Sequence, residues 1–497
     1  MPPGIAIRTR ILAALGQPEA QLALAKIQSG PRASIEAIQL IAAAARAGLP
    51  EAQARLGLCY LNGHGVPANQ AEARHWLERA ADAGDATAQT ELASLALRGV
   101  SGLYERGPFS DAEPSAPDHH LAAELARRAA KTGSAEAQAL LAYILNVAPS
   151  TADGPGEADA LYQQSAATGW PLGQLGHAMT LLKRATPEAA REAMALLTEA
   201  AASGLPTAHF LLGALAESGA VGAVEPRSAV THYRAGAARG HTGSKIRLGL
   251  ALMTGRGTAR DVEEAETWLR RAAQDGDVTA AAILGDFHAS PDRRPPNLGE
   301  AAIWYRRAAD LGHGGAAHAL ARAIAAGAEG HPDPREVAAW LQAAVERGET
   351  AAWRDIGLAV ARAGNGNQPM WDDWLYRMIR EGRAEGGYYA GIRAHDKPGG
   401  RAGEIEARRH YLWAASHGMI EAMAAGAEML LNGRGGPADP DLARALFEYA
   451  AKRGHAGAHF ALGVMAGNEP DRAAAHFRQA ADLGHPRAMI MVESAAA

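Results

Sequence analysis

Glycine recurs along this chain at a nearly constant interval, each time at the end of an alanine-rich segment. Eight of the twelve intervals between successive members of the series are 36 residues long. A period between about 20 and 50 residues marks a repeat protein, in which each unit is one supersecondary element stacked on the next. This repeat, rather than a set of unrelated domains, therefore determines the fold. The closing glycines are Gly48, Gly84, Gly133, Gly169, Gly204, Gly240, Gly276, Gly312, Gly348, Gly382, Gly418, Gly454 and Gly484.

The segment after each closing glycine predicts a helix, which we name helix A. The fourth residue after the glycine is small, as at Ala52 and Ala88, and the eighth is usually leucine or isoleucine, as at Leu56. After each of the first twelve closing glycines the ninth residue is glycine or alanine. Positions four apart fall on one face of an α-helix, so this face is expected to pack closely against a neighbouring helix.

The segment before each closing glycine predicts a second helix, helix B. Its apolar stripe has alanine eleven residues before the glycine and a small pair three and four residues before it. The glycine is expected to end helix B as a left-handed C-cap. In five units tryptophan stands eight residues before the glycine, namely Trp76, Trp268, Trp304, Trp340 and Trp374.

The pattern A-x-x-x-L-G, then G-x-G, then A-x-x-W-(L/Y)-x-x-A-A-x-x-G resembles the Sel-1-like repeat family, a relative of the tetratricopeptide repeat. The resemblance covers about residues 16 to 492, and the units that begin near Pro50 and His241 carry it best. It implies an all-α fold, an α/α superhelix or solenoid of about 12–13 two-helix repeats. It also implies an adaptor role, which is common for this family in signalling, secretion and quality-control assemblies.

The repeat divides the chain into three parts. We expect a diverged N-terminal capping repeat over residues 1–47, a Sel-1-like repeat solenoid over residues 48–484 and a C-terminal capping helix over residues 485–497. Within the solenoid, residues 100–118 form an insertion and the units of residues 348–418 are degenerate. Capping is needed because each helix pair buries its apolar face only against a neighbour.

Composition and motif content exclude several functional classes. Net charge is −5 and no basic stripe occurs, so we expect no nucleic-acid partner. Cys59 is the one cysteine, which rules out an internal disulfide framework and a cysteine-based metal site. No apolar run approaches the ~20 residues of a membrane span and no signal-peptide core is long enough, so we expect a soluble cytoplasmic protein. Because no catalytic or nucleotide-binding motif occurs, we expect no catalytic, cofactor-binding or metal-binding residues and no small-molecule cofactor.

Side chains on the outer face of helix A are candidates for partner binding. Positions four, eight and eleven after the closing glycine pack inward, so positions six, ten and thirteen project outward; by analogy with tetratricopeptide repeats they line the concave side. Arginine and tyrosine dominate binding hot spots, which favours the stretch where they gather. Ordinary solvated groove residues are the alternative interpretation. The predicted partner-binding residues of the concave face are Asp286, His318, Arg322, Arg354 and Tyr388.

Aromatic residues crowd into the units after Gly348, where the repeat pattern breaks down. Two interpretations remain open: bulky side chains fill wider helix spacing, or they form a docking pocket for the partner. The insertion at residues 100–118, with Tyr104 and Phe109, is a second candidate docking element, and disordered filler is its alternative. The predicted aromatic cluster consists of Trp353, Trp371, Trp374 and Tyr389.

These features favour a non-enzymatic scaffold or adaptor that binds another protein, of unknown identity, on the concave face of the superhelix. The family resemblance suggests a bacterial signalling, secretion or envelope-assembly complex as its context. An accessory subunit of a glycan- or cell-wall-processing enzyme is one alternative, and it requires a cleft with an acid pair between Gly348 and Gly418. An exported effector that binds host proteins is the other.

Overall fold

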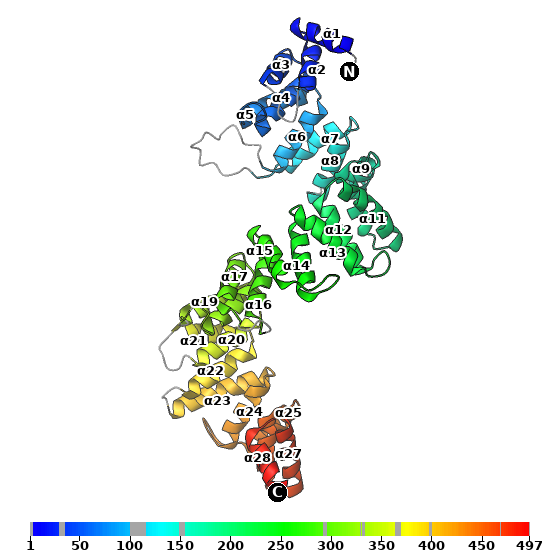
Figure 1. Ribbon diagram of the computed structural model, residues 1–497. Coiled ribbons are helices and arrows are strands. Elements are labelled where there is room, and N and C mark those ends of the chain that lie inside the picture. The colour runs from blue at the N-terminus through cyan, green and yellow to red at the C-terminus, as the bar shows by residue number, and fades with distance from the viewer. Residues whose placement is uncertain are drawn as a thin grey trace. The chain divides into compact units, whose positions relative to one another are not determined.

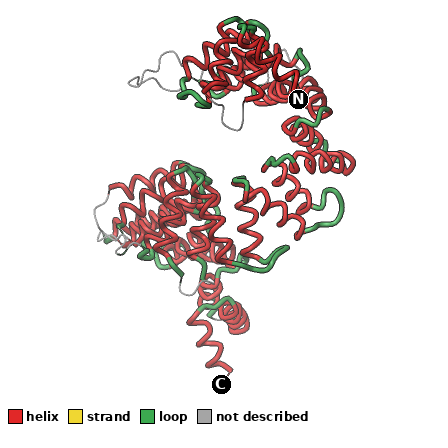
Figure 2. The backbone as a smooth tube through the Cα atoms, turned by 45° about the horizontal axis from the view of Figure 1, so that its top comes forward, coloured by secondary structure: helices red, strands yellow, loops and turns green. Residues whose placement is uncertain are grey.

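The computed structural model describes residues 3–28, 35–99, 116–148, 155–291, 296–328, 330, 333–362, 369–396, 400–467 and 469–496. Within these ranges every regular element is an α-helix (Figure 2), which confirms the all-α prediction. The chain divides into two units, residues 1–272 and 273–497. In each unit, successive helices pack against one another (Figure 1).

The first unit holds α1 to α14 and most of α15. The bounds are α1 (Pro3–Ala14), α2 (Pro18–Gln28), α3 (Ile35–Arg46), α4 (Pro50–Asn62), α5 (Gln70–Asp82), α6 (Ala86–Leu97), α7 (His119–Ala130), α8 (Ala135–Val147), α9 (Pro155–Ala167), α10 (Pro171–Leu182), α11 (Pro187–Ala202), α12 (Pro206–Ser218), α13 (Pro226–Ala238), α14 (Thr242–Thr254) and α15 (Val262–Gln274).

The second unit holds the remaining helices. Their bounds are α16 (Val278–Ala289), α17 (Leu298–Asp310), α18 (Gly314–Ala325), α19 (Pro334–Glu346), α20 (Ala352–Arg362), α21 (Pro369–Arg380), α22 (Ala384–Asp396), α23 (Arg401–Ser416), α24 (Ile420–Leu431), α25 (Pro440–Ala451), α26 (Ala456–Met465), α27 (Pro470–Asp482) and α28 (Pro486–Ala496).

Even-numbered helices from α4 onward are helix A of the repeat, and odd-numbered helices from α5 onward are helix B. An A helix typically packs against the B helix that follows it, as α4 does against α5 and α12 against α13. The B helix then packs against the next A helix, as α17 does against α18. In the degenerate units, α20 packs against the next A helix, α22. This is the two-helix repeat that the sequence predicts, and α2 and α3 form a further pair ahead of Gly48.

The closing glycines adopt the left-handed backbone that the sequence predicts. All thirteen have positive φ, between 75° and 97°. Residues that carry a Cβ are disfavoured in this region, so glycine ends helix B there with little strain. Gly16 follows α1 in the same way, with φ 82°. Helix α1 is therefore the B helix of one more unit, which the sequence analysis did not recognise.

The glycine or alanine at the ninth position of helix A is explained by its contact with helix B. A Cβ on Gly57 would lie 2.7 Å from Cγ of Leu77, and a Cβ on Gly213 would lie 2.5 Å from Cε1 of Tyr233. Leu77 and Tyr233 both stand seven residues before a closing glycine and are 0% and 2% exposed. At these two glycines helices A and B thus approach so closely that helix A has no room even for a Cβ.

In seven of the described repeats the side chain of the residue after the closing glycine caps the next helix A. Nδ1 of His241 accepts a hydrogen bond from the backbone N–H of Ser244 at 3.0 Å, and Nδ1 of His455 accepts one from Ala458 at 3.1 Å. Because an imidazole nitrogen accepts only when it is unprotonated, these caps require neutral histidine. The same bond is formed by His313, His485, Asp85, Asp277 and Ser134.

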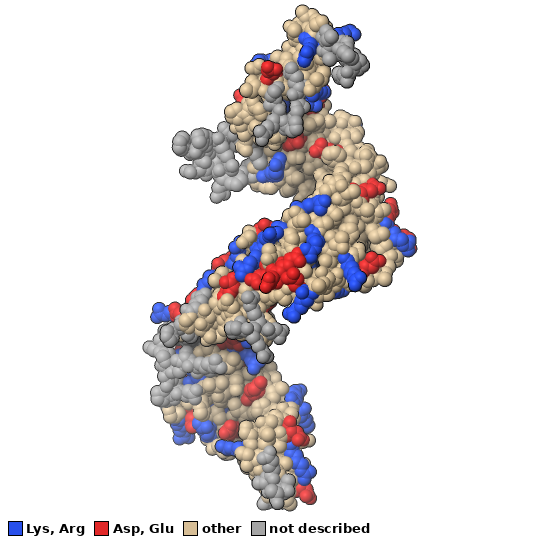
Figure 3. All heavy atoms as spheres, viewed as in Figure 1, with Lys and Arg blue, Asp and Glu red and all other residues tan. Residues whose placement is uncertain are grey.

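A polar ladder joins adjacent B helices. The indole Nε1 of Trp268 donates to Glu264 at 3.1 Å, and the same carboxylate forms an ion pair with Arg234 of the preceding B helix. The tryptophans eight residues before the closing glycine therefore hold side chains of the ladder in place. Figure 3 shows acidic and basic side chains interspersed on the face in view. The same indole–carboxylate bond forms at Trp76, Trp304 and Trp340.

Candidate functional site

The predicted groove residues lie on four A helices of the second unit. Asp286 projects from α16, His318 and Arg322 from α18, Arg354 from α20 and Tyr388 from α22. Asp286, Arg322 and Arg354 are exposed, whereas His318 and Tyr388 are half-buried. Position ten is thus exposed at Asp286 and Arg322, whereas position six is exposed at Arg354 and partly packed at His318 and Tyr388.

Asp355, one residue beyond Arg354, links α18 to α20. Its Oδ2 lies 2.7 Å from Nε2 of His318 and 3.8 Å from Nε of Arg322. The His318 side chain is 14% exposed, but that of Arg322 is 72% exposed. The carboxylate therefore has its main partner on the protein, while most of the guanidinium surface of Arg322 faces solvent.

Asp286 joins the same region through a tyrosine of helix B. The hydroxyl of Tyr305, on α17, donates to Oδ1 of Asp286 at 2.8 Å. Burial raises the pKa of Tyr305 above its ordinary value, and the hydrogen bond to Asp286 raises it further. The positive charge of Arg322 acts in the opposite direction on that pKa. Asp286, Tyr305, Arg322 and Asp355 thus lie in one electrostatic neighbourhood.

A groove runs between α18 and α20, with α19 as its floor. It encloses about 310 Å³. Val337 and Leu341 of α19 form an apolar floor, and Arg322 and Asp355 bring charge to the rim. Such a groove suits an apolar side chain flanked by a polar or charged group. The lining residues, which define the α18–α20 groove, are Ala321, Arg322, Ala325, Ala326, Val337, Leu341, Asp355, Leu358 and Ala359.

Arg354 and Tyr388 lie beyond this groove along the same row of A helices. Burial raises the pKa of Tyr389, and the charge of Arg354 nearby lowers it, which places the Arg354 side chain next to the start of α22. The ring of Tyr388 contacts those of Tyr389 and Tyr411, with centroids 5.4 Å and 5.9 Å apart. Tyr388 therefore contributes to packing of α22 on α23 as well as to the surface.

The aromatic cluster is largely internal. Trp353, Trp374 and Tyr389 are 3%, 8% and 4% exposed, and the two indole rings meet edge to face with centroids 5.6 Å apart. A Cβ on Gly357 would overlap the ring of Tyr389, so that tyrosine fills the gap above a glycine as its counterparts do elsewhere. These side chains pack between helices and present little surface to a partner. The side chain of Trp371 and residues 100–115 of the insertion lie outside the described residues.

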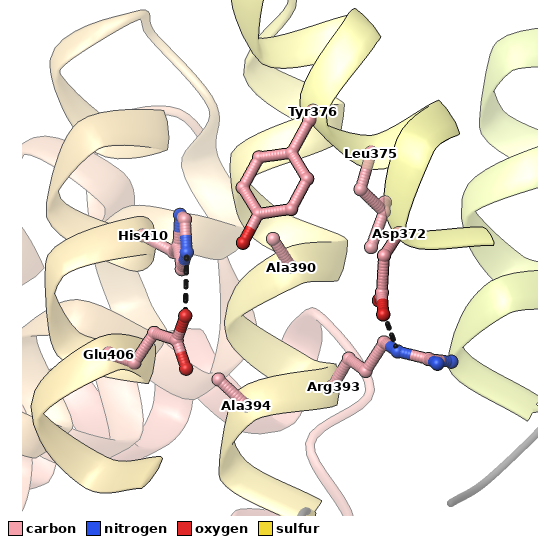
Figure 4. Close-up of a pocket in the computed structure, with 8 residues that line it drawn as sticks. All are labelled: Asp372, Leu375, Tyr376, Ala390, Arg393, Ala394, Glu406 and His410. Carbon is pink, nitrogen blue, oxygen red and sulfur yellow. Dashed lines mark ion pairs between the residues drawn. The ribbon is translucent and has the colours of Figure 1, made fainter. Parts of the chain in front are cut away.

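A small cavity on the B-helix side of the degenerate units is lined by two carboxylates, Asp372 of α21 and Glu406 of α23, which lie on opposite sides of it (Figure 4). Asp372 pairs with Nε of Arg393 at 2.8 Å, and Glu406 lies 4.0 Å from Nε2 of His410. This is the acid pair that the enzyme hypothesis requires. The cavity encloses about 20 Å³, which is room for about one water molecule. A sugar ring does not fit, and both carboxylates already face a basic partner.

The first unit contains a second groove of the same plan. It lies between α12 and α14 over α13 and encloses about 370 Å³. The hydroxyl of Tyr233 donates to Glu217 at 2.7 Å, and Arg247 and Arg256 each lie 3.7 Å from that carboxylate. Glu217 is at the thirteenth position of helix A, which the sequence analysis assigns to the groove. Arg247, like Asp355, is at the seventh position, which that analysis leaves out.

Comparison with known proteins identifies the repeat. The Sel1 repeat family matches the chain at residues 50–85, 87–134, 244–277, 278–313, 420–455 and 456–485. The chain contains six Sel1 repeats. The matched segments coincide with the helix pairs that begin at α4, α6, α14, α16, α24 and α26.

One sequence relative and two solved structures, all bacterial, are similar to this chain. An uncharacterized protein of Neisseria meningitidis is 34% identical over 164 residues, which span a third of each chain. A protective antigen of uropathogenic Escherichia coli with an SLR fold covers 92% of this chain and 97% of its own, at 19% identity and a TM-score of 0.54. A Sel1 repeat protein from Oxalobacter formigenes covers 69% and 87%, at 24% identity and a TM-score of 0.36. The Escherichia coli structure shows the shared fold.

The Sel1 repeat fold supports a protein-interaction scaffold in general, and the family is generally non-catalytic. No described helix combines the length and the apolar content that crossing a lipid bilayer demands. The predicted groove residues other than Asp286 lie between residues 314 and 419, which none of the six matched segments includes. The candidate site thus occupies helix pairs that keep the Sel1 architecture but depart from the Sel1 sequence.

Proposed function

We propose that this Sel1-repeat protein is a scaffold that binds a segment of another protein along the A-helix face of α16 to α22. The α18–α20 groove is the observation that carries the proposal. Its apolar floor offers a partner a contact from which water is excluded, and the 72% exposed side chain of Arg322 offers a charged contact beside it. Binding hot spots have this composition, with arginine at the edge of a well-packed apolar pocket.

The charges at the groove favour a partner segment with an apolar anchor next to a carboxylate. Asp355 is already paired with His318 at 2.7 Å, whereas Arg322 contacts the same carboxylate only at 3.8 Å and is mostly exposed. Arg354 adds a second exposed guanidinium on the next A helix. A carboxylate of the partner would pair with these guanidinium groups, while its apolar neighbour would enter the space above Val337 and Leu341.

We further propose, as the family resemblance suggests, that the partner belongs to a bacterial signalling, secretion or envelope-assembly complex in the cytoplasm, and that the A-helix face is the concave face. Affinity purification and mass spectrometry from the native cell would supply the partner. Its affinity for the purified chain would then be measured by calorimetry.

Two variants test the groove with the captured partner. R322E reverses the exposed charge, and A325W fills the groove from an exposed position on α18. We expect each to weaken binding at least tenfold, about 1.4 kcal/mol. R335E, an equivalent charge reversal at an exposed position of α19 that does not line the groove, is the control and should bind as the wild type does. Equal affinities for all four proteins would reject this surface.

A further inference from the structure

Two helix pairs, one in each unit, share a histidine and aromatic constellation that the other pairs lack. The sequence Ala-His-Phe occurs at residues 208–210 of α12 and again at residues 458–460 of α26. In the following B helix, the position held by tryptophan in five units is instead histidine, His232 in α13 and His476 in α27. The same two departures from the repeat thus occur together in both places.

In the second unit the two imidazoles face each other with a specific geometry. Nδ1 of His459 lies 3.2 Å from Nδ1 of His476, and the ring centroids are 5.5 Å apart. Two nitrogen ligands of a tetrahedral zinc ion, each at about 2.0–2.1 Å from the metal, lie roughly 3.3–3.4 Å apart. The separation of the two Nδ1 atoms therefore matches one edge of such a coordination tetrahedron within about 0.2 Å.

In the first unit the equivalent rings lie at a similar separation. The centroids of His209 and His232 are 5.9 Å apart, and the interplanar angle is 37°, against 40° for the other pair. Both ring nitrogens of His209 are buried and have no hydrogen-bond partner among the described residues. Buried polar atoms of this kind are rare in proteins and point to a bound water or ion.

The phenylalanine of each Ala-His-Phe sequence stacks on a further histidine. His241 stacks on Phe210 with centroids 4.8 Å apart, and His485 stacks on Phe460 with centroids 4.3 Å apart. The Nδ1 atoms of His241 and His485 already accept capping hydrogen bonds from helix A. His241 and His485 therefore serve as helix caps, which leaves the two histidines of each pair as the candidate ligands.

We propose that each histidine pair, His209 with His232 and His459 with His476, binds one borderline divalent transition-metal ion, with Zn²⁺ as the probe. Among the described residues no group of three or more histidine, cysteine, aspartate and glutamate side chains is placed to hold a metal. Each site therefore supplies two protein ligands and leaves the remaining coordination positions to water. Imidazole is a preferred ligand of zinc, copper and nickel, so other ions of this class compete for the same sites.

The repeat itself provides the variants that test the proposal. H232W and H476W restore the tryptophan that five other units carry at this position, so each removes a ligand while keeping a residue that the repeat accommodates. Zn²⁺ would be titrated by calorimetry into the tag-free full chain after chelator treatment. We expect two equivalents for the wild type, one for each single variant and none for the double variant. H64Q, at an exposed turn residue, should retain both equivalents.

Circular dichroism would show whether the variants keep their helical content, and H232Q with H476Q would replace any tryptophan variant that does not. Absence of Zn²⁺ binding to the wild type below about 100 µM would overturn the proposal, because the 3.2 Å contact would then be an imidazole–imidazole hydrogen bond only. Retention of both equivalents by the double variant would overturn it equally, because the metal would then lie elsewhere.

Discussion

Replacing Gly204 by alanine tests how far the repeat depends on its closing glycine. Gly204 follows α11 with φ 91°, and a Cβ built there meets no atom within 4 Å. The change adds no clash, so its cost is that of a left-handed L-residue, about 1–2 kcal/mol. The lower entropy of alanine in the unfolded chain offsets about 0.4–1 kcal/mol. We therefore expect a net loss of roughly 1 kcal/mol in the free energy of unfolding.

Gly156 provides a matched control in the same unit. It is the second residue of α9, and a Cβ added there also meets nothing within 4 Å, but its φ is not in the positive range. Alanine has the higher helix propensity and the lower unfolded-state entropy, so G156A should stabilise the unit by up to about 1 kcal/mol. The same chemical change is thus expected to act with opposite sign at the two glycines.

The assay is urea unfolding followed by far-ultraviolet circular dichroism, with wild type, G204A and G156A compared under one condition. A lower midpoint for G204A together with an equal or higher midpoint for G156A agrees with the backbone argument. Midpoints that move in the same direction by similar amounts would refute it, because the sign would then not depend on the left-handed conformation.

Three further predictions concern binding, packing and pH. The double variant R354A/Y388A should weaken partner binding by at least tenfold, about 1.4 kcal/mol, as measured by calorimetry. Unchanged binding would show that these two side chains do not belong to the binding surface. L248A removes a side chain that is 0% exposed in α14 and should cost about 2–5 kcal/mol of unfolding free energy in urea; a loss below 1 kcal/mol would contradict the packing described. Burial lowers the pKa of His241 below its ordinary value of 6.5, so its stabilising contribution is complete above that pH and is lost as the pH falls through the lower, folded-state pKa. Between pH 7 and pH 5 the wild type should therefore lose more stability than H241N, whose cap does not titrate, and an equal loss in both proteins would argue against this capping role.

The helix pairs and their ends followed from the sequence because their determinants are local. A closing glycine needs only its own backbone conformation, and a capping residue such as His241 or Asp85 bonds three residues along the same helix. The spacing of small residues likewise identifies the face of helix A that packs inward. These signals repeat in register, so each unit reinforces the assignment of the others.

The contacts between neighbouring repeats were harder to predict, because they depend on how adjacent helices are rotated and how closely they approach. Asp355, at the seventh position of helix A, was missed because its partner is His318 of the preceding A helix, 37 residues away in the sequence. Trp353 and Trp374 were consistent with either packing or a docking pocket, and their 3% and 8% exposure corresponds to packing. Side chains seven residues before a closing glycine, such as Tyr305, fill the space above helix A only where helix A has a glycine opposite them.

Hydrogen–deuterium exchange of the chain with and without its captured partner tests the binding proposal most directly. Slow exchange in helices comes from buried hydrogen bonds, and a bound segment should protect the helices that it covers. We predict new protection in α18 and α20, at residues 314–325 and 352–362, with exchange in α4 to α8 unchanged. Protection confined to B helices or to the first unit would contradict the account.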